Sequence, residues 1–252
     1  MQIRAAQDVP VAVLCARYSG HRSRTLLWSM DTDVFVPGQW LKGGVEVLDV
    51  SPNGQYMAYY AQTFHRPIPS YFAISRPPFL KALDFRPVRS CSWCDAIFLD
   101  DRTYEWVGSP LSGSDWCGDS PYNRPRQEKG CPLIQKAWRG KEWPDLRLLD
   151  RETSRPGVRN AIERYGSGAA ALLESPIEGI GIFPAADAIL AETRTAIWDW
   201  QSRLIVVDGW RVLAFSEDSP EGVELIDLSG QTFDQVAAPG WARTWSLNAK
   251  RL

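Results

Sequence analysis

Short apolar segments joined by tight-turn residues are the feature that most constrains the fold of this chain. Residues 45–60 contain two such segments, separated by the tetrapeptide Ser-Pro-Asn-Gly. Proline fixes the backbone early in this tetrapeptide and Asn-Gly supplies the positive φ that reverses the chain, so the stretch predicts a β-hairpin. Residues 203–215 form a second pair of segments around Asp208-Gly209, which suits a two-residue type I′ turn. The sequence therefore favours an antiparallel, β-rich fold.

Similar signals extend along the whole chain. Three further strand pairs are predicted, at 25–28 with 34–36, at 96–99 with 103–107 and at 223–228 with 232–236. Short helices are expected at 158–165, 169–174 and 184–192. Residues 108–130 are rich in Gly, Pro, Ser and Asp and are expected to form a long loop. Because no stretch has the composition of a flexible linker, residues 1–252 are expected to form a single β-rich domain.

An apolar pair followed by aspartate recurs about every 50 residues. Four such aspartates are 51, 50 and 49 residues apart, and each closes an expected strand just before a turn: Asp49, Asp100, Asp150 and Asp199. Three more triplets of this kind lie off the period, ending at Asp84, Asp208 and Asp227. A period of this length fits a four-stranded unit with a long loop, and the chain has room for about five such units.

Residues 45–62, which read VEVLDVSPNGQYMAYYAQ, resemble a β-propeller blade. Their strand, Ser-Pro-x-Gly turn and strand are similar to the blade signature of the broad class that includes WD40-like and TolB-like repeats. The resemblance covers one blade. It implies an all-β, propeller-like repeat of antiparallel hairpins with about five blades. A β-sandwich with insertions is the alternative fold.

Composition and charge exclude several classes of protein. The net charge is -2 over 252 residues, and no apolar run reaches the roughly 18 to 20 residues of a membrane-spanning helix. The first twenty residues lack the apolar core of a signal peptide, so we expect a cytoplasmic protein with no membrane partner. A sequence pI near 5.8 disfavours nucleic acid as a partner.

Five cysteines favour a reducing compartment over a disulfide framework, since an odd number cannot pair completely. Four of them are candidate zinc ligands: Cys91, Cys94, Cys117 and Cys131. Only the first two have the spacing of a zinc-binding pair, because 13 residues separate the second two. Buried thiols are therefore favoured over a zinc site, and we expect neither a metal nor a cofactor.

Local charge is uneven although the net charge is small. Residues 124–141 contain six basic side chains and one acidic one, whereas residues 208–234 contain seven acidic side chains and one basic one. The acidic segment is either a solvated loop or a surface for a basic protein partner. For the second case the candidate contact residues are Glu217, Asp218, Glu221 and Glu224. Two of the twelve tryptophans lie in expected loops and are added to the candidate surface: Trp116 and Trp143.

Catalytic motifs are absent from the sequence. It has no nucleophile elbow, phosphate-binding loop, zinc-protease helix or EF-hand loop, and its two histidines, His21 and His65, have no evident catalytic partner. The favoured hypothesis is a non-catalytic macromolecule-binding protein, for example an immunity protein that neutralises a basic toxin. The alternative is a carbohydrate-active enzyme or sugar-binding module that uses tryptophans and paired carboxylates, either the repeated aspartates or Asp115 and Asp119.

Overall fold

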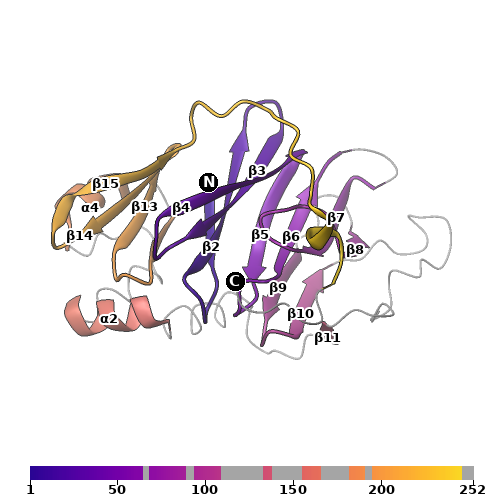
Figure 1. The fold of residues 1–252 in the computed structure, drawn as a ribbon, viewed down its shortest axis with the longest axis horizontal. Coiled ribbons are helices and arrows are strands. Elements are labelled where there is room, and N and C mark those ends of the chain that lie inside the picture. Colours follow the sequence, from indigo (N-terminus) through magenta and orange to yellow (C-terminus); the bar gives the residue numbers. More distant parts are fainter. Residues whose placement is uncertain are drawn as a thin grey trace.

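The part of the chain that the structure describes forms four β-sheets (Figure 1). The structure is a computed structural model that describes residues 1–64, 68–88, 94–108, 133–137, 155–165, 182–190 and 195–245. Strands predominate in these residues, which confirms the expected all-β class. The described strands form four sheets rather than the two facing sheets of a sandwich. In this part of the chain, no helix is long and apolar enough to cross a membrane.

Sheets 1 and 2 are antiparallel and follow the order of the chain. Sheet 1 consists of β1 (Gln2–Ala5), β2 (Val11–Tyr18), β3 (Arg22–Ser29) and β4 (Val34–Lys42). Sheet 2 consists of β5 (Gly44–Val50), β6 (Met57–Gln62), β7 (Ser70–Ser75) and β8 (Asp84–Pro87). The first and last strands of each sheet are therefore its two edges.

Sheets 3 and 4 complete the described strands. Sheet 3 consists of β9 (Cys94–Phe98), β10 (Thr103–Gly108) and β11 (Ile134–Ala137), and β11 runs parallel to β10. Sheet 4 is antiparallel and consists of β12 (Ala196–Trp198), β13 (Leu204–Asp208), β14 (Arg211–Ser216) and β15 (Ser219–Asp227). The described helices are α2 (Pro156–Tyr165), α4 (Pro184–Leu190) and the short 3-10 helix η2 (Gly240–Arg243).

Both principal hairpins are confirmed, with differences at their turns. Val50 pairs with Met57, and of the predicted Asn-Gly pair only Gly54 has a positive φ, of 71°. Asn53 instead stabilises the turn through its side chain, whose Oδ1 accepts from the Gln55 backbone N–H at 3.0 Å. In the second hairpin Gly209 and the residue after it form the loop, one position later than predicted.

The other predicted elements have mixed outcomes. Strand pairs at 25–28 and 96–99 are confirmed by β3–β4 and β9–β10, and helices are present as α2 and α4. The pairing of 223–228 with 232–236 is wrong, because β15 pairs with β14 and residues 232–236 form no strand. The helix expected at 169–174 and residues 109–130 of the expected loop lie outside the described residues.

Apolar side chains fill the seams between the sheets and fix their order as 4, 1, 2, 3 (Figure 1). Side chains alternate along β2, so Leu14 packs toward sheet 4 while Val13 and Cys15 pack toward sheet 2. Phe72 and Phe98 join sheet 2 to sheet 3 in the same way. A further cluster buries α2 and α4 against the other face of sheet 4. No core cluster in the described residues joins sheet 3 to sheet 4.

A partly buried ionic network ties sheet 4 to sheet 1. Arg203, just before β13, donates from its two Nη atoms to the carboxylate of Asp33 at 2.8 and 2.7 Å. Its Nε donates to the fully buried carboxylate of Asp199 at 2.8 Å. Asp33 lies in the β3–β4 turn and also accepts from Trp28 Nε1 at 3.2 Å. A guanidinium held by two carboxylates in this fixed geometry sets the distance between the two turns.

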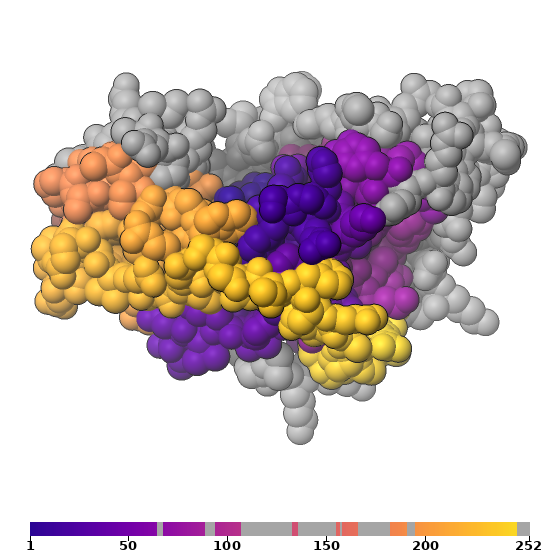
Figure 2. Space-filling model, turned by 90° about the horizontal axis from the view of Figure 1, so that it is seen from above, coloured from indigo at the N-terminus to yellow at the C-terminus, as the bar shows by residue number. Residues whose placement is uncertain are grey.

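The C-terminal segment, residues 228–245, crosses the outside of the stack from sheet 4 past sheet 1 (Figure 2). Asp234 accepts from Trp40 Nε1 at 2.7 Å and lies 3.4 Å from Arg24, whose side chain is only 5% exposed. Further along, Arg76, which follows β7, donates to the Trp241 carbonyl at 3.1 Å. Two more contacts extend the series: Gln39 with Val236 and Tyr56 with Trp245. The segment is therefore held mainly by side chains.

Arg203→Met is expected to lower the free energy of unfolding by about 3 kcal/mol, because it leaves the buried Asp199 carboxylate without its cation. Urea unfolding followed by tryptophan fluorescence measures the change. Arg211→Met is the matched control, since the carboxylates near Arg211 are exposed and its loss should cost less than about 1 kcal/mol. Equal effects of the two substitutions would contradict a structural role for the network.

Candidate functional site

The four acidic residues singled out in the sequence lie together on the β14–β15 hairpin at the outer edge of sheet 4. We call them the acidic edge: Glu217, Asp218, Glu221 and Glu224, all exposed. Glu217 pairs with Arg164 at 3.7 Å and Glu224 approaches Arg211 at 4.0 Å. Asp218 and Glu221 have no ion pair among the described residues. The edge therefore carries more negative charge than its neighbours neutralise.

Backbone geometry holds the acidic edge in place. Gly222 has a φ of 86°, and a Cβ at this position would lie 2.6 Å from Cε1 of Phe215, so only glycine fits. The β14–β15 register shifts twice, and Pro220 has no backbone N–H to offer. Bulges and proline at an edge strand hinder the addition of another strand. A partner at this edge must therefore be recognised through side chains.

The negative charge continues to the far end of β15. Asp227 accepts from the Ser229 backbone N–H at 2.7 Å, and this hydrogen bond lowers the pKa of the Asp227 carboxyl below its ordinary value. Val223, between the carboxylates, is 47% exposed. The strand thus presents an apolar side chain among charged ones.

The two tryptophans proposed as contact residues, Trp116 and Trp143, lie outside the described residues. Two other aromatic side chains are exposed on the C-terminal segment, Phe233 at 55% and Trp241 at 47%. Each has an arginine over its ring, at 5.1 Å for Arg22 and 5.0 Å for Arg76. Their exposure could not be predicted from neighbouring residues, because it follows from the path of the segment across the stack.

The repeated aspartates bond to backbone N–H groups. Asp100 accepts from Arg102 N at 2.7 Å and Asp199 accepts from Gln201 N at 2.9 Å, as expected of turn-capping residues. Asp49 differs because its partner is distant in sequence: it accepts from Phe98 N of sheet 3 at 2.6 Å. Asp150 lies outside the described residues, as do Asp115 and Asp119. Where they are described, these carboxylates stabilise backbone, which gives the carbohydrate hypothesis no support.

Cysteine ligation of zinc cannot be assembled from the described residues. Cys94 is a free thiol, and Cys91, Cys117 and Cys131 lie outside the described residues. No group of three metal-ligating side chains occurs in the described ranges. Burial raises the pKa of the Cys94 thiol to about 12, so at neutral pH it is protonated.

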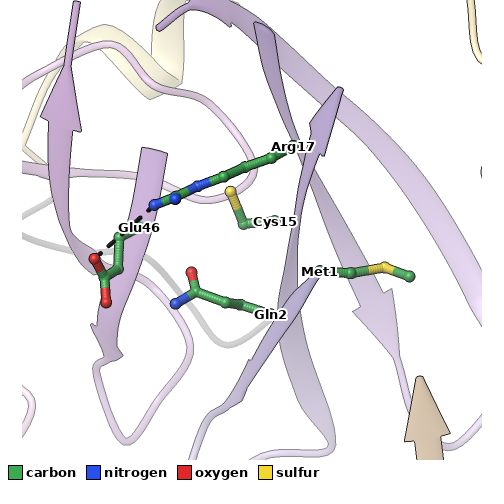
Figure 3. Close-up of a pocket in the computed structure, with 5 residues that line it drawn as sticks. All are labelled: Met1, Gln2, Cys15, Arg17 and Glu46. Atoms are coloured by element: carbon green, nitrogen blue, oxygen red, sulfur yellow. Dashed lines mark ion pairs between the residues drawn. The ribbon is translucent and has the colours of Figure 1, made fainter. Parts of the chain in front are cut away.

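A pocket of about 230 Å³ opens where sheets 1 and 2 meet (Figure 3). Its lining comes from β1, β2 and β5 and consists of Met1, Gln2, Cys15, Arg17 and Glu46. Arg17 reaches from β2 toward Glu46 on β5, with Nη2 3.9 Å from Oε2. Cys15 lies beside the Arg17 side chain and donates from Sγ to the Val45 carbonyl at 3.5 Å. The sequence did not point to this site, because its residues come from separate strands.

Comparison with known proteins places this chain in no family. No family model, no curated protein and no solved structure matches it. The function of this chain must therefore be inferred from the geometry of the acidic edge and of the pocket.

The Cys15 thiol is expected to resist alkylation in the folded protein. Burial raises its pKa from the ordinary 9.0 to about 12, so the reactive thiolate is scarce at pH 8. Iodoacetamide treatment followed by peptide mass spectrometry should label Cys15 only after unfolding. Labelling at equal rates in the folded and unfolded states would contradict this picture.

The same shift predicts how stability depends on pH. Between pH 9 and 12 the unfolded chain loses the Cys15 proton while the folded protein keeps it, so the group stabilises the fold below pH 9 and this contribution disappears as pH rises. The loss is at most about 1.4 kcal/mol per pH unit. Urea titrations of the wild-type protein and of Cys15→Ala should give a shallower decline for the variant. Parallel declines would sink the assignment.

Proposed function

We propose that this chain is a non-catalytic binding protein whose acidic edge binds a basic protein partner. The observation that carries the proposal is an ordered strand edge with four exposed carboxylates, two of which, Asp218 and Glu221, have no ion pair among the described residues. Because pairing with β14 already orders the backbone of this edge, binding of a partner would not require that backbone to become ordered.

Charge complementarity explains what the acidic edge contributes. Exposed carboxylates accelerate the encounter with a basic surface and exclude acidic competitors, and salt weakens this effect because the Debye length is about 8 Å at physiological ionic strength. Val223 adds an apolar contact within the charged surface. The expected complex is therefore steered by charge and sensitive to salt.

The four sheets are, in this proposal, blades of a propeller-like ring of about five. Three observations support it: sheets 1, 2 and 4 are each four-stranded meanders, β5 contacts both β1 and β9, and sheet 4, the last in the chain, packs on sheet 1, the first. Such a ring would close between sheet 3 and sheet 4. Edge-on blades of this kind leave their outer strands, β15 among them, available to a partner.

An immunity protein that neutralises a basic toxin is the specific form of binding we favour. A protein that inhibits a toxin by covering its basic surface needs carboxylates complementary to that surface and needs no catalytic group of its own. We place the protein in the cytoplasm, since Cys15 and Cys94 are free thiols. In this form of the proposal the complex would abolish the partner's activity.

Neutralising the acidic edge is expected to weaken partner binding at least about tenfold, which corresponds to about 0.4 kcal/mol for each of four charges. The variant is Glu217→Gln, Asp218→Asn, Glu221→Gln and Glu224→Gln combined. Partners are captured from cells of the source organism, identified by mass spectrometry, purified, and measured by calorimetry at about 0.05 and 0.5 M salt.

The control is Asp8→Asn with Asp31→Asn, two exposed acidic residues in turns of sheet 1. It should retain the wild-type partner and affinity. A captured protein that binds the neutralised variant as tightly as the wild type, or that binds equally at both salt concentrations, would refute the role of the acidic edge.

A further inference from the structure

The pocket between sheets 1 and 2 contains two opposite charges, Arg17 and Glu46, that form no hydrogen bond with each other. Arg17 Nη2 and Glu46 Oε2 are 3.9 Å apart, beyond the 2.7–3.2 Å of a hydrogen bond. Their side chains are 58% and 43% exposed, so the pair contributes little to stability and can be separated at little cost. Both groups remain able to take a ligand.

The donors of the pocket are held in orientation by backbone contacts. Arg17 donates from Nε to the Val45 carbonyl at 3.1 Å, which fixes the plane of the guanidinium and leaves its Nη atoms toward Glu46. Gln2 accepts from the Val47 N–H through Oε1 at 3.3 Å, so its amide nitrogen remains a donor. Figure 3 shows the Gln2 amide directed to the same space as Glu46 and Arg17.

We infer that this pocket binds a small zwitterion, an α-amino acid in chemical class. Its carboxylate would accept from the guanidinium of Arg17 and the amide nitrogen of Gln2, and its ammonium group would donate to Glu46. This site is on sheets 1 and 2, apart from the acidic edge on sheet 4, and does not depend on the function proposed above.

Charge and size both select for this class. A simple anion would be repelled by Glu46 and a simple cation by Arg17, whereas a zwitterion satisfies both. The volume of about 230 Å³ is smaller than the roughly 300–1,000 Å³ of pockets for drug-sized ligands. The Cys15 thiol, beside the Arg17 side chain, donates to the Val45 carbonyl and adds no charge.

The test is a binding screen on the full chain with free amino acids. Saturation-transfer NMR with pools of the twenty common amino acids identifies a binder, and calorimetry gives its affinity. The N-acetyl and C-amide forms of the same amino acid should bind at least about tenfold more weakly, because each lacks one of the two charges. Triglycine carries the same two charged groups far apart, at its two termini. It should bind more weakly than the free amino acid if the pocket requires both charges on one carbon.

Two variants and a control locate the site. Arg17→Met and Glu46→Gln should each weaken binding at least about tenfold, whereas Arg211→Met, an exposed arginine near acidic residues elsewhere, should not. Thermal melting verifies that each variant is folded. If a variant fails to fold, the affinities of the wild-type protein for the N-acetyl and C-amide ligands test the same charge requirement. The inference is overturned if no free amino acid binds, if the blocked forms or triglycine bind equally well, or if both variants keep wild-type affinity.

Discussion

Sheet 1 is apolar on both faces, and the arrangement of the other sheets depends on this constraint. Leu14 and Trp28 contribute to the seam with sheet 4, while Val13 and Cys15 contribute to the seam with sheet 2, all of them almost fully buried. A sheet with two apolar faces needs a packing partner on each face, because an uncovered apolar face would be exposed to water. The stack of sheets follows from this alternation, and the network around Arg203 sets its geometry at the first seam.

The position of the acidic edge follows from the same packing. Sheet 4 packs against sheet 1 on one face and against α2 and α4 on the other, so β15 offers a partner its outer side and its turn rather than a face. The pocket has a different origin, since it lies where the first strands of two sheets run beside each other. The acidic edge is therefore formed by a single hairpin, whereas the pocket is formed by the packing of two sheets.

This difference explains what the sequence could predict. Hairpins and their turns are local, so Asn53, Gly54 and Gly209 marked them correctly to within one residue. The exposure of the four residues of the acidic edge could also be predicted locally, because charged side chains that follow one another along the chain favour a solvated position. Arg17 and Glu46 lie on strands of different sheets, and only the stacking brings them together. The path of residues 228–245 could not be predicted for the same reason, because side chains of earlier sheets hold it and apolar alternation made it resemble a strand.

The seam between sheets 4 and 1 joins two sheets that are far apart along the chain, so sheet 4 is synthesised well after sheet 1. Sheet 1 is complete once Lys42 has been added, but β15 ends only at Asp227. At translation rates of about 5–20 residues per second, the apolar face around Trp28 stays uncovered on the ribosome for on the order of ten seconds or more. During that interval the apolar face of sheet 1 is open to other apolar surfaces, which is the condition that favours aggregation of a chain still being synthesised.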